Sequence, residues 1–521
     1  MPRLARIPPH PQLLPLNVVT PGHLGLNLQQ ESSLLPPDWA TEAQNAVIDN
    51  SGRLAARLGI NTVTGSPIAG TPVIKTLFEQ RTATGGSTVI VAWNGGISSS
   101  VSNPSGSDIS GGVTTADGTW HFANFNNKVI GFQNGQKLIV RSAGNFATVV
   151  ESSGTAPTGG VGTAAYGRVW QVGADGHTIQ YSGLLDETAW NSGGAGQFDM
   201  ANVWPQGTDE ITALVAFNHT MVVFGRKQLV FLGDQNPTVL GLDVSTLRVV
   251  DVINGTGCVS QHTVQHVGDT DLVWLSPTGI QTMQRLLVQR SRPVSSLTKY
   301  VRDALVAQLA SETENNIRSV YSPTYGFYAV SFPTSRYTWL VDLRKSFQDP
   351  DGDTVSPVTR WTIAPTALFE TVGRIFYTSG IAGGTVGQYA AGPDNGNTYR
   401  YKFQTPWLDL GSDYSTRLKI LKRIGAIVFV RNTVNVIFRY YVDFSSIGRQ
   451  ETKTATSGGN AAEWGSGQWG LSEWSGGALL QLLHIAAGGA GQYFRFSAEA
   501  DVSNDFAIQQ AEIFAKLGRI A

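Results

Sequence analysis

The strongest constraint on the fold is a hairpin pattern that the chain repeats. Residues 215–234 read VAFNHTMVVFGRKQLVFLGD, in which two short apolar runs flank the polar turn Gly225–Gln228. Two strand-like runs separated by turn residues are typical of a β-hairpin. Residues 123–140 read ANFNNKVIGFQNGQKLIV and repeat the pattern, with Phe125-Asn126 in the place of Phe217-Asn218. The chain therefore contains one small structural unit more than once.

Seven strand-like cores share this pattern, at intervals of 40, 40, 52, 51, 55 and 48 residues. They are centred on Val89, Val129, Val169, Met221, Leu272, Phe327 and Ile375. Such intervals match one four-stranded sheet per repeat, as in WD-type repeats of about 40–45 residues and kelch repeats of about 50. Radially arranged blades bury both faces of each sheet, which accounts for continuous apolar runs such as MVVF. We therefore predict an all-β fold in which residues 66–395 form a β-propeller of six to eight blades. The alternative is a set of unrelated hairpins in β-sandwiches.

The segments on either side of residues 66–395 have different patterns. Residues 1–65 are rich in proline and irregular, which predicts an N-terminal arm with one short helix-like patch at Trp39–Ile48. Residues 396–521 contain five or six half-buried strand patterns, which predict a compact C-terminal β-sandwich. The clearest of these runs are PWLDL, IGAIVFV, VNVIFRYYVDF, YFRFSAEA and FAIQQAEIFAKLG.

One helix is expected within the β-rich region, near residues 296–310, in the run SSLTKYVRDALVAQLASE. Ser295 or Ser296 is placed to cap its N-terminus. Its apolar face is formed by residues four apart, Leu297, Val301, Leu305 and Leu309. We expect this helix to pack against the outside of a blade or against a neighbouring subunit.

The composition excludes several classes of protein. Lys plus Arg number 37 against 38 Asp plus Glu, so the chain lacks the basic footprint of a nucleic-acid-binding protein. A single cysteine, Cys258, excludes an internal disulfide framework. Apolar runs are much shorter than the roughly 20 residues of a membrane span, and prolines make the start a poor signal peptide. We expect a protein made in a cytosol-like compartment or released by lysis.

Sequence signatures of catalysis are missing. The chain has no Walker A, HExxH or G-x-S-x-G motif. Cys258 lies four residues before His262, as a nucleophile and base could, but a buried thiol near a polar strand residue is the favoured interpretation. His262 and His266 would share a face only on a helix, whereas VSQHTVQHVG predicts a strand. We predict a non-enzymatic protein with no catalytic, cofactor-binding or metal-binding residues.

The best candidate for a metal site is the run DPDGD, which contains Asp349, Asp351 and Asp353. Alternate carboxylates can converge on a hard cation such as Ca²⁺. The run departs from an EF-hand loop, because Gly352 is at position four and Arg360 at position twelve. A solvated loop between strands is therefore the favoured interpretation.

Aromatic residues suggest two further sites. The run EWGSGQWGLSEWSGG places Trp464, Trp469 and Trp474 at steps of five, where the indoles could stack on sugars or fill a subunit interface or core. The interface or core is favoured because Trp is enriched at such positions. A sialidase-like propeller is the enzyme worth testing, although its Asp-box repeat is only faintly matched by DETAW at Asp186–Trp190.

Two stretches go beyond general β character. Residues 25–59, GLNLQQESSLLPPDWATEAQNAVIDNSGRLAARLG, contain the frame N-x-x-x-D-x-x-G-x-L-x-x-R-x-G, in which Asn45, Gly52, Arg57 and Gly59 fall. Residues 169–233 run from VWQVGADGHTIQYSGLLDETAW to FGRKQLVFLG, and LVWLSPTGIQTMQR and YSPTYGFYAVSFP continue the pattern. These stretches resemble the tail hub or nozzle (tail tubular, head-to-tail stabilisation) proteins of short-tailed bacteriophages.

The resemblance implies a virion structural protein, assembled in the bacterial host cytoplasm into a ring of typically six subunits in the phage tail. Such a ring contacts itself, the portal and adaptor proteins, and tail fibres or tailspikes, while duplex DNA passes through its lumen. A lumen lined with Lys and Arg would slow the genome, since each neutralised phosphate adds salt-dependent affinity. The balanced charge of this chain suits weak DNA binding. The alternative function is a carbohydrate-binding or glycan-cleaving propeller acting on bacterial surface polysaccharide.

Overall fold

The computed structural model describes residues 13–201, 203–205, 207–234, 241–288, 296–410, 416–456, 479–503 and 506–518. Nearly all regular structure in these ranges is β-strand, which confirms the predicted all-β class. No helix in the same ranges has the length and apolarity to span a membrane. The chain divides into two compact units. Unit 1 comprises Met1–Gly59, Ser356–Thr362 and Ala391–Ala521, and unit 2 comprises Ile60–Val355 and Ile363–Ala390.

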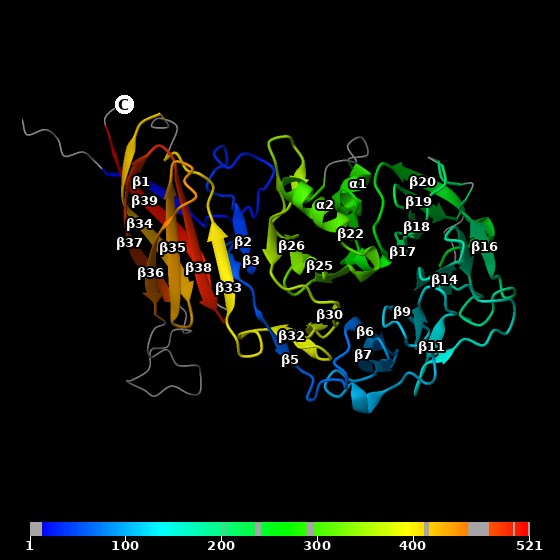
Figure 1. The fold of residues 1–521 in the computed structure, drawn as a ribbon. Helices are drawn as coiled ribbons and strands as arrows, with labels where there is room; N and C mark the ends of the chain where they lie inside the picture. Colours follow the sequence, from blue (N-terminus) through cyan, green and yellow to red (C-terminus); the bar gives the residue numbers. More distant parts are fainter. Residues whose placement is uncertain are drawn as a thin grey trace, which may run out of the picture. The chain divides into compact units, whose positions relative to one another are not determined.

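Most of unit 2 consists of antiparallel strand groups of three or four strands that follow one another along the chain (Figure 1). Groups 1 to 4 are formed by β6 (Ile74–Arg81), β7 (Ser87–Trp93) and β8 (Gly96–Ser98); β9 (His121–Phe125), β10 (Lys128–Phe132), β11 (Ile139–Arg141) and β12 (Ala147–Thr148); β13 (Gly162–Ala165), β14 (Arg168–Val172), β15 (Thr178–Tyr181) and β16 (Gly196–Asp199); and β17 (Ala213–Phe217), β18 (Thr220–Phe224), β19 (Gln228–Gly233) and β20 (Arg248–Asn254).

Groups 5 to 7 complete this series in the described part of unit 2. They are formed by β21 (Gln265–Val267), β22 (Asp271–Ser276) and β23 (Gly279–Thr282); β24 (Arg318–Ser322), β25 (Phe327–Phe332) and β26 (Tyr337–Asp342); and β30 (Leu368–Glu370), β31 (Phe376–Ser379), β32 (Val386–Ala390) and β5 (Gly59–Thr62). In group 7 the early strand β5 lies next to the late strand β32. Strands from the two ends of unit 2 therefore share one group.

The seven cores predicted from the sequence all fall in the second strand of a group or, for Ile375, directly before it. Every residue of β19 and β25 is buried, as expected for sheets covered on both faces. The repeated hairpin pattern in the sequence therefore corresponds to the second strand of each group together with the adjacent strands of the same group.

Neighbouring groups share apolar clusters. Five buried apolar clusters each join two groups. Their representative residue pairs are Ile90 and Val129 for groups 1 and 2, Phe132 and Val169 for groups 2 and 3, Trp170 and Val223 for groups 3 and 4, Phe224 and Trp274 for groups 4 and 5, and Val386 and Val91 for groups 7 and 1. The rings of Phe327 and Phe376 pack between groups 6 and 7, with centroids 6.2 Å apart. The Tyr328 hydroxyl of group 6 donates to the Thr263 carbonyl just before group 5, at 2.6 Å. Contacts thus run through all groups and return to the first, which makes unit 2 propeller-like.

Two short α-helices interrupt the strands of unit 2. The sequence predicted α2 (Arg302–Ala310), on which Leu305 is buried, but did not predict α1 (Met283–Val288). Ser295 lies outside the described residues, and the expected cap by Ser296 is wrong. The 3-10 turn η4 (Lys299–Val301) precedes α2, and Val301 occupies the N-cap position of α2. The Ser296 hydroxyl instead contacts the Thr298 hydroxyl at 3.3 Å. The other 3-10 turns described are η1 (Ser105–Ser107), η2 (Val244–Thr246), η3 (Gln261–Thr263) and η5 (Glu314–Asn316).

Unit 1 contains two mainly antiparallel sheets. One comprises β1 (Leu13–Val19), β3 (Ala46–Ile48), β4 (Leu54–Ala56), β34 (Lys419–Val430), β37 (Leu479–Gly491) and β39 (Phe506–Leu517), and the other comprises β2 (Glu42–Gln44), β29 (Val358–Trp361), β33 (Tyr399–Gln404), β35 (Val434–Val442), β36 (Arg449–Ala455) and β38 (Phe494–Val502). Alternate residues of β35 are buried, so one face is covered. The rings of Tyr401 and Phe506, one from each sheet, pack with centroids 5.1 Å apart. The buried faces of the two sheets therefore contact each other.

Two local predictions in unit 1 are wrong. The helix-like patch at Trp39–Ile48 contains strands β2 and β3, which pair with β33 and β4. Pairing with distant chain decides the structure there, because three-residue strands carry almost no periodicity of their own. The run PWLDL forms no strand, and Leu408 makes only an isolated bridge to Phe494.

Candidate functional site

A cavity of about 590 Å³ lies among the strand groups of unit 2. Its wall is built from residues within five segments, 116–136, 159–176, 210–226, 259–262 and 313–315. These segments belong to groups 2 to 4 and to the chain that leads into groups 5 and 6. The first strands of most consecutive groups contact one another, so side chains at their starts come together although they are far apart in sequence.

Two imidazoles border this cavity. His121 is the first residue of β9 and His262 lies in η3, and their ring centroids are 6.0 Å apart. Burial, and then the charge of Arg318, lower the pKa of His121 to about 4. The pKa of His262 is well below its usual range, mainly because the ring is buried and then because of the charges of Arg318 and His121. Both rings are therefore neutral at pH 7, and no described residue forms a hydrogen bond with their nitrogens.

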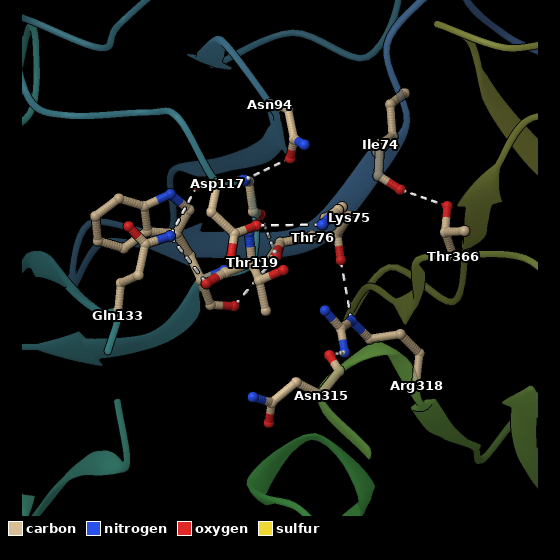
Figure 2. A network of polar contacts seen from close by, with 12 residues as sticks. Ile74, Lys75, Thr76, Asn94, Asp117, Thr119, Gln133, Asn315, Arg318 and Thr366 are labelled. Carbon is tan, nitrogen blue, oxygen red and sulfur yellow. Dashed lines mark hydrogen bonds and ion pairs between the residues drawn. The ribbon is translucent and has the colours of Figure 1, made fainter. Parts of the chain in front are cut away.

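Arg318, the first residue of β24, brings a buried positive charge close to these rings. Its Nε donates to the Lys75 carbonyl at 3.0 Å, and one terminal nitrogen donates to the Asn315 carbonyl at 2.6 Å (Figure 2). The same terminal nitrogen also donates to the Ile317 carbonyl at 2.9 Å. Burial lowers the pKa of Arg318 to about 10, with an opposing contribution from Asp117. Within the described ranges Arg318 forms no ion pair, so its charge is not neutralised, and its second terminal nitrogen forms no hydrogen bond there.

The remaining charges around the cavity are paired. Asp117 contacts the Lys75 ammonium at 3.3 Å (Figure 2). Arg226 contacts Glu210 at 3.3 Å and Glu314 at 2.8 Å. Of these ion pairs, the one between Arg226 and Glu314 joins two different segments of the cavity wall. The ion pairs also place an acidic and arginine cluster at the cavity.

Cys258 and His262 do not form a nucleophile–base pair. Cys258 is fully buried, and its thiol contacts the Ser260 carbonyl at 3.4 Å and the Thr263 hydroxyl at 3.5 Å. Burial raises the pKa of the Cys258 thiol to about 11. A thiol with this pKa and no access to solvent is not a nucleophile at neutral pH. His266, on β21, is exposed and is not part of the cavity wall.

The three aspartates of the DPDGD run converge, but on a lysine. They lie between the short strands β27 (Phe347–Gln348) and β28 (Thr354–Val355). The Lys299 ammonium is 2.6 Å from Asp349, 2.6 Å from Asp351 and 3.2 Å from Asp353. It therefore occupies the place that a cation would take. No group of three metal-ligating side chains that could hold a metal ion occurs in the described part of the chain.

The aromatic candidates divide into two cases. Asp186 of the DETAW run accepts hydrogen bonds from the backbone and hydroxyl of Thr188 at 2.8 and 2.7 Å, and the indole of Trp190 is buried. This run is a structural turn. The three tryptophans Trp464, Trp469 and Trp474 lie outside the described residues, so their predicted place at an interface or core remains a prediction.

The N-terminal frame has a structural explanation within unit 1. Gly52, with φ of +80°, lies in the turn between β3 and β4, and its N–H donates to the Asp49 carbonyl at 2.9 Å. Leu54 is fully buried. The completely buried Arg57 guanidinium pairs with Asp394 and donates to the Asn45 side chain at 3.2 Å.

Glycine is required at the end of this frame by close backbone contact. A Cβ on Gly59 would lie 2.3 Å from the Gly392 carbonyl oxygen, a separation that atoms cannot adopt. The frame residues thus close a turn, bury a charge and allow two backbone segments to approach. None of them faces the cavity of unit 2.

Sequence reasoning weighed His262 of the cavity only as a partner of Cys258 or His266, and it missed His121 and the nearby Arg318. His121 and Arg318 each begin the strand that precedes a predicted core, Val129 or Phe327. Polar residues at this repeated position are the one signal that could have identified them. Recognising it requires the spatial order of the groups, which local patterns do not give.

Comparisons with known proteins add little to this geometry. No protein-family model matches the chain, and a search of curated proteins finds no match. The computationally designed Ika8 protein is similar with a TM-score of 0.32 and 12% identity, covering 64% of this chain and 99% of its own. The extracellular domain of a one-component system protein from B. thetaiotaomicron is similar with a TM-score of 0.28 and 10% identity, covering 67% of this chain and 57% of its own. YCF48 from Cyanidioschyzon merolae is similar with a TM-score of 0.25 and 9% identity, covering 64% of this chain and 98% of its own. Scores this low decide neither fold nor function.

Proposed function

We propose that the protein is a structural subunit of a bacteriophage virion and forms a hexameric ring that serves as the nozzle or hub of a short tail. In this proposal the seven strand groups of unit 2 are the blades of a propeller closed by β5, and unit 1 is a β-sandwich platform. The ring meets the portal and adaptor proteins through unit 1, and the blade loops meet tail fibres or tailspikes.

The N-terminal frame carries this proposal. The residues that resemble the phage family, Asn45, Gly52, Arg57 and Gly59, all have structural roles in unit 1. A family likeness carried by a turn, a buried ion pair and a close backbone contact supports a shared architecture. It supports no shared chemistry, which agrees with a scaffold function.

The cavity of unit 2 constrains the path of DNA in this proposal. A volume of about 590 Å³ is within the range of small-molecule sites and much too small for a duplex. The conduit would therefore lie between subunits around the ring axis. A heterologous interface that closes on itself produces such a ring.

The experiment that tests the proposal is mass photometry with cryo-electron microscopy, on the isolated protein and on its native particle. A closed ring of six would have a mass of 335 kDa, from 6 × 55.8 kDa. A ring around a central channel supports the conduit. A monomer in both preparations contradicts it, and a ring only in the particle indicates assembly templated by the adaptor.

A second candidate function is carbohydrate binding or cleavage on bacterial surface polysaccharide. The specific observation in its favour is the cluster of Arg226 with Glu210 and Glu314 at the cavity. Saturable binding or hydrolysis of bacterial glycans, lost in Arg226→Gln, would favour it. The absence of any signal on a glycan array or in a hydrolysis assay would leave the structural function preferred.

A further inference from the structure

The charge of Arg318 is the unusual feature beside the cavity in unit 2; Arg318 does not line the cavity, but it donates to the carbonyl of Asn315, which does. Burying a guanidinium is costly unless an opposite charge compensates it. Three backbone carbonyls accept from its Nε and one terminal nitrogen but carry no net charge, and no described residue accepts from the other terminal nitrogen. Asp117 is already paired with Lys75, and Arg226 with Glu210 and Glu314. The Arg226 cluster keeps one net negative charge, but of these carboxylates only Asp117 acts on the pKa of Arg318, so the positive potential is confined to the part of the cavity close to Arg318.

The two imidazoles next to this charge offer hydrogen bonds that the protein does not use. A neutral imidazole has one N–H donor and one acceptor nitrogen, and a protonated one has two donors. His121 and His262 both border the cavity, with ring centroids 6.0 Å apart. In the described part of the chain no group bonds to their nitrogens. A ligand in the cavity could therefore reach donors from both rings.

We propose that this cavity binds a small oxyanion, a carboxylate or phosphate group, between His121 and His262 and close to the charge of Arg318. The inference does not depend on the proposed ring. The oxyanion would come from a free phosphate or from the carboxylate of an acidic sugar. Either oxyanion would compensate the positive charge of the buried guanidinium and accept hydrogen bonds from the N–H groups of the two rings.

Binding should be coupled to proton uptake. An anion offsets the repulsion that Arg318 exerts on protonated imidazoles, so the pKa values of His121 and His262 rise in the complex. The other charged groups around the rings are Asp117, Lys75 and the Arg226 cluster, and their pairing leaves Arg318 as the dominant influence. Affinity should therefore increase as the pH falls.

The test is isothermal titration calorimetry of the full chain with sulfate, an oxyanion whose charge is constant over the pH range used. We expect sulfate to bind about ten-fold more tightly near pH 5.5 than near pH 7.5, the effect expected if the complex returns the pKa of one imidazole from about 4 to its ordinary value of 6.5. In the double variant His121→Gln and His262→Gln, binding should weaken and lose its pH dependence. The matched control is His266→Gln, which changes an exposed histidine outside the cavity and should behave as the wild type.

Phosphate and glucuronate distinguish the two sources of the oxyanion. Phosphate binding tighter than sulfate and glucuronate identifies a phosphate site, and tighter glucuronate binding identifies an acidic sugar. Failure of all three to saturate the protein at about 10 mM would overturn the proposal. Unchanged sulfate binding in the folded double variant would also overturn it, because the anion would then bind elsewhere. Circular dichroism confirms folding of each variant, and Arg318→Gln, if folded, should abolish sulfate binding.

Discussion

The guanidinium of Arg57 and the carboxylate of Asp394 form a two-point ion pair, with nitrogen–oxygen distances of 2.8 and 2.5 Å. Arg57 is completely buried, and its guanidinium also lies 3.9 Å from the centre of the Tyr399 ring. The pair joins the N-terminal part of unit 1 to its C-terminal part. Arg is suited to this position because its planar fork matches a carboxylate and stacks on an aromatic ring.

Removing the Arg57 side chain should strongly destabilise unit 1. Arg57→Met leaves the Asp394 carboxylate without its buried partner, which typically costs about 3–5 kcal/mol. Arg57→Lys should also destabilise, since an ammonium cannot make both bonds of the fork. Calorimetry should show a lower melting temperature for the affected transition. The control Arg81→Met changes an exposed arginine and should shift stability by less than about 0.5 kcal/mol. A similar effect of both variants would contradict the structural role of the pair.

Replacing Lys299 should convert its aspartate cluster into a cation site. In Lys299→Ala, Asp349, Asp351 and Asp353 face one another without the ammonium, and we expect a loss of about 2 kcal/mol, less than for a fully buried pair. Millimolar Ca²⁺ should then raise the melting temperature of the variant and leave that of the wild type unchanged. A variant insensitive to Ca²⁺ would show that the carboxylates separate once the lysine is removed.

The same cluster predicts a pH dependence. Burial alone would raise the pKa of Asp349, but hydrogen bonds from Lys299 and the Asp353 backbone lower it. A carboxylate whose pKa is lower in the folded state stabilises the fold at pH values above its unfolded-state pKa of about 3.9. This stabilisation is lost as the pH falls through the folded-state pKa. Hydrogen bonds to the aspartates raise the pKa of Lys299 against the effect of burial. Its contribution is complete below about pH 10 and is lost at higher pH. Acid titration of Asp349→Asn, followed by fluorescence, should show a smaller loss of stability below about pH 4 than the wild type.

Cys258 should be unreactive in the folded protein. Its burial and its pKa of about 11 leave very little thiolate at pH 8. A chromogenic disulfide reagent should label one thiol per chain in denaturant and almost none under native conditions, since the chain has one cysteine. Rapid native labelling would reveal frequent opening between groups 4 and 5, whose apolar cluster contains Cys258.

The sequence predicted the parts of the fold that local patterns determine. Six of the seven cores lie in strands, and those at Val129 and Met221 lie in continuous apolar runs that are buried on both faces. The short strands β2 and β3 were mistaken for a helix because their pairing partners lie elsewhere in the chain. The cavity was missed for a similar reason. His121 and Arg318 begin strands of groups 2 and 6, which are far apart in the sequence, and neither residue has a local motif. Only the closed series of groups brings them close enough for Arg318 to act on the pKa of His121.

The proposed conduit predicts weak binding to duplex DNA. The chain has 37 basic and 38 acidic side chains, and it lacks the excess of cations that releases counterions from phosphates. Fluorescence anisotropy with a labelled duplex at about 150 mM salt should give a Kd weaker than about 1 μM. Tighter binding would count against a passage through which the genome moves freely.

The repeated turn before the second strand predicts a stabilising substitution. In groups 2 and 4, two-residue turns join the first and second strands, and both central residues have positive φ: 45° and 60° at Asn126 and Asn127, 43° and 58° at Asn218 and His219. Such turns favour asparagine followed by glycine, because a side chain is strained in the left-handed region. This preference explains why Phe-Asn recurs in the two hairpins.

His219→Gly should therefore stabilise unit 2 by about 0.5–1 kcal/mol, measured as a higher melting temperature in calorimetry. His219→Val should destabilise it by about 1–2 kcal/mol, because a β-branched residue tolerates positive φ poorly. Asn127→Gly is the matched comparison in the other hairpin. It relieves the same strain but loses the hydrogen bond of 2.6 Å from the Ala83 backbone to the Asn127 side chain, so its net gain should be smaller. If His219→Gly lowered the melting temperature, the turn would not limit the stability of this group, and the recurrence of Phe-Asn would need a cause outside the folded hairpin.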